Sequence, residues 1–179
     1  LRSSAPMSMR PTDRTPPLAE SAGSKDGSGS PALRKAELTL SVAESCTGGL
    51  VGQMLTGVPG SSGFLLFDAV TYANSAKSRV LGVRKELLRA HGAVSAECAA
   101  AMAEGVRKVG ESDVGIAITG IAGPGGGTDA KPVGTVFFAV AREGQPTITK
   151  HRTFPGDRSR VRTLAAYSVL KALREAIRG

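Results

Sequence analysis

The feature that most constrains the fold of this sequence is a regular alternation of short apolar strands with helical segments, beginning near residue 36. Residues 37–43 alternate with the period of two that a half-buried strand requires. Residues 95–109 form an alanine-rich amphipathic pattern, which is typical of a helix. Strands that alternate with helices predict a layered α/β sandwich. At 179 residues, the chain is expected to form one such domain.

The same reading gives bounds for each element. Strands are expected at residues 37–43, 64–71, 114–119, 133–141 and 147–154, the last two as a hairpin. Helices are expected at residues 48–56, 74–82, 84–90, 95–109 and 157–177. Asn74, Ser95 and Asp157 are the expected N-caps, and Gly82 is expected to end its helix. The sheet should therefore be mixed but mostly parallel.

The net charge of +8 does not by itself indicate a nucleic-acid binder. The basic excess lies in the first 35 residues and in the last helix, while the central body is nearly neutral. Aromatic residues make up only 4% of the chain and are scattered, whereas single-strand binders stack bases on clustered aromatics. We therefore expect no nucleic acid as the main partner; a basic-ended nucleic-acid binder is the less favoured interpretation.

Residues 1–34 are rich in Ser, Pro, Arg and Gly and should form a disordered tail, followed by a domain over residues 35–179. A transit peptide within this tail is a further interpretation. Two cysteines, Cys46 and Cys98, fit neither a disulfide framework nor a zinc motif. No apolar run approaches the roughly 20 residues of a membrane span. These features indicate a cytoplasmic protein without a membrane partner.

Two junctions after expected strands carry the most informative side chains, Ser45 and Lys77. If the two strands are parallel neighbours, both side chains reach the same edge of the sheet, where open α/β sheets bind their ligands. Burial and the positive end of the following helix would lower the pKa of Lys77 toward a neutral amine. Such an amine can accept the proton of a serine nucleophile.

Other interpretations of these junctions remain open. Ser45 or Thr47 can simply cap a helix, Cys46 can be a small buried residue, Lys77 can be a solvated surface lysine and Tyr72 can be strand packing. A Ser-His-Asp triad built on His91 or His151 is not excluded by spacing. Gly48 and Gly49 should expose backbone N–H groups suited to an anion, while the glycine-rich loop 120–128 matches neither a P-loop nor a dinucleotide motif.

Eight short strings, in order and with matching spacing over residues 38–177, carry a family resemblance. They are AESCTGG (43–49), VPGSS (58–62), TYANSAK (71–77), LGV (81–83), HGAVS (91–95), TGIAGPGG (119–126), KPVGTV (131–136) and FPGDR (154–158). Together they resemble the C-terminal domain of the competence/damage-inducible protein CinA, a family that includes stand-alone nicotinamide-nucleotide amidases. The resemblance implies a three-layer α/β/α fold.

The resemblance also implies an activity: hydrolysis of the carboxamide of nicotinamide mononucleotide to nicotinic acid mononucleotide and ammonia, in pyridine-nucleotide salvage. It implies no metal and no cofactor, a pyridine mononucleotide as partner, and we expect a homo-oligomer. Ser45 would be the nucleophile, Lys77 its base and Tyr72 a supporting hydroxyl. The expected substrate-binding residues are Thr47, Gly48, Gly49, Thr119, Gly120, Gly123, Gly125, Arg158 and Arg162, the two arginines as candidates for the phosphate.

The sequence departs from the family pattern in two places. Phe67-Asp68-Ala69 stands where glycine or Arg-Gly is usual, and only residues 32–35 stand where the family has a long helix before the first strand. The alternative to an enzyme is a non-catalytic nucleotide-binding or protein-interaction module linked to competence or DNA damage. Release of ammonia distinguishes the two.

Overall fold

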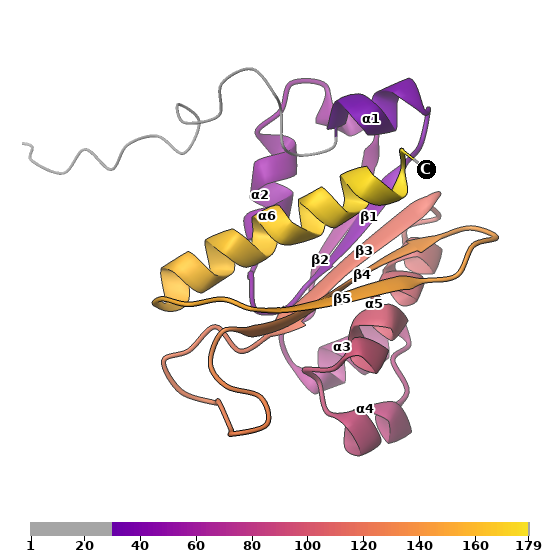
Figure 1. Ribbon diagram of the computed structural model, residues 1–179. Helices are drawn as coiled ribbons and strands as arrows, with labels where there is room; N and C mark the ends of the chain where they lie inside the picture. The colour runs from indigo at the N-terminus through magenta and orange to yellow at the C-terminus, as the bar shows by residue number, and fades with distance from the viewer. Residues whose placement is uncertain (1–29, 179) are drawn as a thin grey trace, which may run out of the picture.

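A computed structural model describes residues 30–178, in which five strands form one mixed sheet (Figure 1). The strands are β1 (Leu40–Glu44), β2 (Leu65–Val70), β3 (Val114–Gly120), β4 (Thr135–Arg142) and β5 (Ile148–Thr153). Their spatial order is β2-β1-β3-β4-β5. The β1 strand pairs in parallel with β2 and β3, whereas β3–β4 and β4–β5 are antiparallel. The expected hairpin and the expected mixed sheet are both confirmed.

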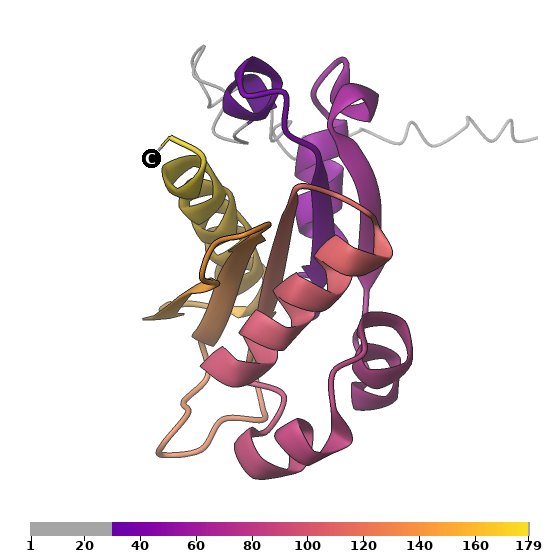
Figure 2. The same ribbon diagram turned by 90° about the vertical axis from the view of Figure 1, so that its right-hand side faces the viewer.

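Helices cover both faces of this sheet, which confirms the three-layer α/β/α architecture (Figures 1 and 2). One face carries α1 (Ser30–Lys35), α2 (Leu50–Thr56) and α6 (Arg158–Ala176), and the other carries α3 (Asn74–Leu81), α4 (Lys85–His91) and α5 (Ala96–Val109). A short 3₁₀ turn, η1 (Ser61–Gly63), follows α2. This arrangement places the carboxyl ends of β1 and β2 at one end of the molecule, beside the start of α3.

The core consists of two apolar layers, one on each side of the sheet. Between the sheet and α6 lie branched side chains such as Ile116 and Leu170, together with Leu33 of α1. Between the sheet and α5 the residues are smaller, mostly alanines. Gly115 of β3 permits this close approach, because a Cβ there would overlap the carbonyl oxygen of Ala103 in α5. The alanine-rich pattern thus packs α5 tightly onto the centre of the sheet.

Three of the expected helix boundaries are present with their capping contacts. Ser95 Oγ accepts a hydrogen bond from the Cys98 backbone N–H at 3.1 Å, and Asp157 Oδ1 accepts one from the Arg160 N–H at 2.8 Å. Gly82 ends α3 in the left-handed conformation with φ 70°. The sequence therefore predicted these three helix ends correctly.

The expected cap at Asn74 is wrong. Ala73 occupies the N-cap position with extended dihedrals, Asn74 is already helical, and no side chain caps this end. The carbonyl of Ala73 accepts the N–H of Lys77 at 3.1 Å. Lys77 is consequently the fourth helical residue rather than the third, and the positive end of the helix lies about one residue farther from it.

The first strand begins at Leu40, three residues later than expected. The chain leaves α1 through Glu37, whose φ of 54° forms a turn, and only then enters the sheet. The α1 helix also spans the expected boundary between residues 34 and 35, because Leu33 is fully buried in the core. The expected disordered tail lies mostly in residues 1–29, which are outside the described residues.

Candidate active site

The structure brings Ser45 and Lys77 together at the carboxyl end of the sheet. Ser45 directly follows β1 and Lys77 lies in the first turns of α3, which follows the neighbouring parallel strand β2. The distance between Lys77 Nζ and Ser45 Oγ is 3.0 Å. Topology brings the two residues to the same edge, because parallel neighbours deliver their following residues there.

The amine of Lys77 is buried among neutral oxygen atoms. Lys77 as a whole is 1% exposed. Its Nζ donates to the backbone oxygens of Thr71 at 2.7 Å and Tyr72 at 3.1 Å. Burial lowers the pKa of Lys77, and the negative charge that Cys98 and Cys46 would carry as thiolates opposes this shift. In all three contacts Nζ is the donor, the third being to Ser45 Oγ. A neutral amine, with two N–H bonds and one lone pair, would keep both carbonyl contacts and accept the hydroxyl hydrogen of Ser45 in the third. The three contacts therefore suit a proton acceptor for Ser45.

Neither neighbouring cysteine is activated as a nucleophile. Burial, above all, raises the pKa of Cys46 to about 12, and it also raises the pKa of Cys98. Both side chains therefore remain thiols at neutral pH, and a thiol is a poor nucleophile compared with a thiolate. Cys46 belongs to the apolar layer beneath α6, which agrees with its interpretation as a small buried residue.

A buried carboxylate, Glu44, shapes the turn that carries Ser45. Its Oε2 accepts the N–H of Gly49 at 2.9 Å and its Oε1 accepts the N–H of Gly52 at 2.8 Å. Gly48 and Gly49 both have positive φ, 59° and 94°, which a residue with a side chain rarely adopts. Glu44 was missed in the sequence; the available signal was an acid placed just before a glycine-rich helix start.

These contacts correct the expected role of Gly48 and Gly49. Gly48 N–H donates to the Ser45 carbonyl at 3.1 Å, and Gly49 N–H donates to Glu44, so both donors serve the turn itself. Within residues 30–178, the N–H groups of Cys46 and Thr47 form no hydrogen bond to another residue. The donor adjacent to a nucleophile commonly belongs to the oxyanion hole. In the described part of the chain, Cys46 and Thr47 therefore supply the backbone N–H groups next to Ser45 that have no acceptor.

Arginines from the start of α6 span the site. Arg158 donates to Tyr72 Oη at 3.0 Å and to the Gly123 carbonyl at 2.8 Å, which joins three segments distant in sequence. Arg162 donates from Nη2 to the Thr47 carbonyl at 2.6 Å. Tyr72 is 59% exposed, and its hydroxyl contacts Arg158 rather than Ser45. Thr47 is fully buried, so its hydroxyl does not face solvent.

The glycine-rich segment contributes less than expected. Thr119 is buried and its Oγ1 donates to the Ala93 carbonyl at 2.8 Å, which fixes the loop before α5 rather than lining a cleft. Gly120 lies in β3, where a Cβ would overlap the carbonyl oxygen of Thr135. Gly125 is exposed with open space around it. Within this loop, only Gly123 makes a hydrogen bond to a site residue of the described chain.

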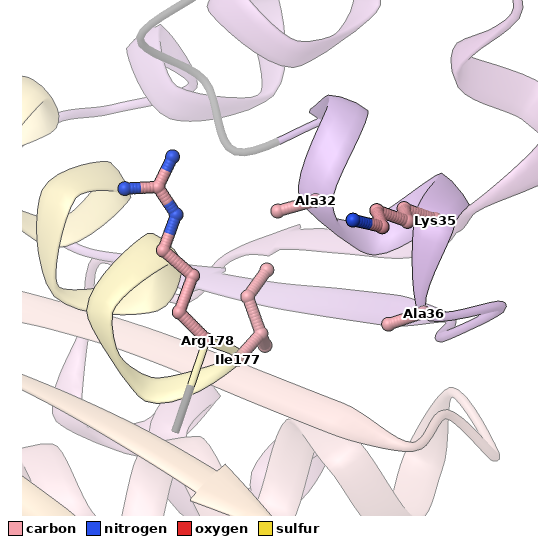
Figure 3. A pocket seen from close by; sticks show the side chains of 5 residues that line it. All are labelled: Ala32, Lys35, Ala36, Ile177 and Arg178. Carbon is pink, nitrogen blue, oxygen red and sulfur yellow. The ribbon is translucent and has the colours of Figure 1, made fainter.

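The two histidines lie in other surroundings. His91 Nδ1 is 3.4 Å from Glu97 Oε1, and the His151 ring stacks on Phe137 with 4.7 Å between centroids. Neither histidine forms a hydrogen bond with Ser45 in the described region, which leaves Lys77 as its basic neighbour. A cavity of about 500 Å³ lies at the other end of the sheet, between α1 and the end of α6 (Figure 3). It is lined by Ala32, Lys35, Ala36, Ile177 and Arg178 and takes no part in this site.

The fold and the site together define a three-layer α/β protein with a buried serine–lysine pair at the carboxyl edge of its sheet. The family described as the CinA C-terminal domain matches residues 27–177. The chain belongs to this family, as its sequence strings indicated. None of the helices in residues 30–178 is long and apolar enough to cross a membrane.

Several known proteins are similar to this chain. A CinA-like protein from Anaeromyxobacter dehalogenans is 56% identical over 139 residues, covering 78% of this chain and 34% of that protein. One from Syntrophotalea carbinolica is 52% identical, covering 76% and 33%. The chain thus spans about a third of these relatives. The crystal structure of a CinA superfamily protein from Klebsiella pneumoniae has 37% identity and a TM-score of 0.81, covering 86% of this chain and 95% of that one.

Proposed function

We propose that this chain is an amidohydrolase that uses Ser45 as nucleophile and Lys77 as general base. The observation that carries this proposal is the 3.0 Å contact between Ser45 Oγ and a lysine amine buried among neutral oxygens. A lysine that merely stabilised the fold would be expected to pair with a carboxylate or to extend into solvent. Membership in the CinA family, together with the resemblance described above, supports nicotinamide mononucleotide as substrate.

The first half of the reaction forms an acyl-enzyme. Ser45 Oγ attacks the carboxamide carbon while its proton passes to Lys77 Nζ, and the carbonyl oxygen becomes an oxyanion. The N–H groups of Cys46 and Thr47 are the proposed donors to that oxyanion. Collapse of the tetrahedral intermediate breaks the C–N bond. Lys77 returns its proton to the departing nitrogen, which leaves as ammonia.

The second half hydrolyses the ester. Water attacks the acyl carbon and gives a proton to the now neutral Lys77. Collapse of the second intermediate breaks the bond to Ser45 Oγ, which takes back a proton from Lys77. The products are the acid and the free enzyme, so no external oxidant or group donor is needed.

The phosphate of the substrate is proposed to bind at the start of α6. Arg158 is exposed and its guanidinium is held by Tyr72 and Gly123 on the rim of the site. A guanidinium fork suits a phosphate because it presents two parallel N–H donors. Tyr72 would then act mainly by orienting Arg158, instead of supporting Ser45 directly.

The test measures ammonia release from nicotinamide mononucleotide, free nicotinamide and the dinucleotide. The mononucleotide should be the preferred substrate. Ser45→Ala should abolish release with an unchanged circular dichroism spectrum, and Ser61→Ala in η1 is the matched control that should retain it. A fully active Ser45→Ala enzyme would refute the assignment of Ser45 as the nucleophile. A wild-type protein that binds the mononucleotide and releases no ammonia would favour the non-catalytic binding module.

A further inference from the structure

The buried carboxylate of Glu44 has a second acid beside it, Asp68 in the edge strand β2. Their side chains lie on the same face of neighbouring parallel strands, since Val42 pairs with Asp68 and Glu44 pairs with Val70. Gly52 of α2 lies over both. A Cβ at residue 52 would overlap Asp68 Oδ2 and would lie 3.6 Å from Glu44 Oε1. Two carboxyl groups therefore converge on one glycine.

The two acids differ in exposure and have no neutralising partner. Glu44 is fully buried, whereas Asp68 as a residue is exposed at the sheet edge although its carboxyl is turned inward onto Gly52. Desolvation, and then the negative charge of Glu44, raise the pKa of Asp68 to about 7. The basic side chains of Lys77 in α3 and Arg162 in α6 contact backbone and hydroxyl oxygens. In residues 30–178 neither acid forms an ion pair.

We propose that Asp68 is a positioning residue for Ser45, acting through the charge that it places beside Glu44. Glu44 closes the turn after Ser45 by holding the N–H groups of Gly49 and Gly52. A neutral Asp68 leaves this carboxylate in place. An ionised Asp68 repels it, which loosens the turn and moves Ser45 Oγ away from its proton acceptor. The inference rests on the proposed amidohydrolase function for its kinetic consequence, but its structural consequence is independent of activity.

The kinetic test compares kcat of the wild type with that of Asp68→Asn between pH 6 and pH 8.5. Lys77 titrates in both proteins, so its effect cancels in the ratio of the two rates. The ratio of variant to wild type should be near one at pH 6 and about ten at pH 8, because a group with pKa near 7 is then about nine-tenths ionised. Glu86→Gln, at an exposed position on α4, is the control and should give a flat ratio. A flat ratio for Asp68→Asn would overturn the proposal, since a purely structural effect would not follow this titration.

The second test needs no substrate. Amide hydrogen exchange, followed by NMR, should show that protection of the Gly49 and Gly52 N–H groups falls about tenfold from pH 6 to pH 8 in the wild type, after correction for intrinsic exchange. Protection should stay constant in Asp68→Asn. The Gly110 N–H, which bonds to Val106 in α5, is the internal reference. If this pattern appears in a protein that releases no ammonia, the proposed function fails and the coupling stands; if protection of Gly49 and Gly52 is independent of pH, the coupling fails whatever the activity.

Discussion

Removing the Glu44 carboxylate is the most direct perturbation of the turn that carries Ser45. In Glu44→Ala, the buried N–H groups of Gly49 and Gly52 lose acceptors at 2.9 and 2.8 Å. Hydrogen bonds to a charged group contribute about 1.5–3 kcal/mol each, and buried donors without a partner are costly. Relief of the desolvated charge offsets part of this loss. We therefore expect the free energy of unfolding to fall by about 3 kcal/mol, a large share of the roughly 5–15 kcal/mol of a typical domain.

The assay is urea unfolding followed by circular dichroism at pH 5.5, where Asp68 is neutral and does not contribute its charge. Glu44→Gln keeps one acceptor but turns an NH₂ group toward the other backbone amide. Its free energy of unfolding should therefore fall by less, about 2 kcal/mol. Glu86→Gln removes only an exposed ion pair with Arg89 and should cost less than about 0.5 kcal/mol. A loss below about 1 kcal/mol for Glu44→Ala would refute the view that this carboxylate holds the turn.

The remaining predictions concern Lys77 and Asp68. Lys77→Arg should reduce ammonia release by about 10³-fold, because a guanidinium cannot act as a base at neutral pH; a rate within tenfold of the wild type would contradict the assignment. Burial lowers the pKa of Lys77. In Asp68→Asn, which lacks the second titration, kcat/KM should therefore rise with pH and reach its plateau at a lower pH than an ordinary lysine pKa of about 10.4 would give. The pKa of Asp68 is higher in the folded state than in the unfolded state. Its ionisation therefore lowers the free energy of unfolding as the pH rises from about 4 to about 7. In urea unfolding at pH 8, the free energy of unfolding of Asp68→Asn should therefore exceed that of the wild type by about 1 kcal/mol, after allowance for solvent screening. At pH 4 the two proteins should have the same free energy of unfolding.

Local signals in the sequence predicted most of the secondary structure. Ser95 and Asp157 cap their helices and Gly82 ends one, because side-chain oxygens and positive φ act within a few residues. The Asn74 cap was wrong because the residue before it, Ala73, already has the extended dihedrals of an N-cap. The late start of β1 followed from α1, which tertiary packing of Leu33 stabilises.

The candidate site was only partly visible in the sequence. The sequence placed Ser45 and Lys77 after two strands and predicted that they meet if those strands are parallel neighbours. The structure pairs β1 and β2 in parallel, and the two side chains are 3.0 Å apart. The expectation that Gly48 and Gly49 offer free N–H groups failed, since a side chain from the preceding strand occupies the Gly49 donor. Thr119 likewise bonds to a distant loop instead of facing a ligand.

What the sequence by itself determined is therefore most of the elements, their order along the chain and the two chemical groups, Ser45 and Lys77, that follow two of the strands. These follow from periodicity and from residue types read over short windows. Only the tertiary structure decided the protonation environment of Lys77, the bridge of Arg158 to Tyr72 and Gly123, and the convergence of Glu44 and Asp68 on Gly52. The physical reason is that burial and electrostatic coupling depend on which atoms exclude water, and those atoms come from strands and helices far apart along the chain.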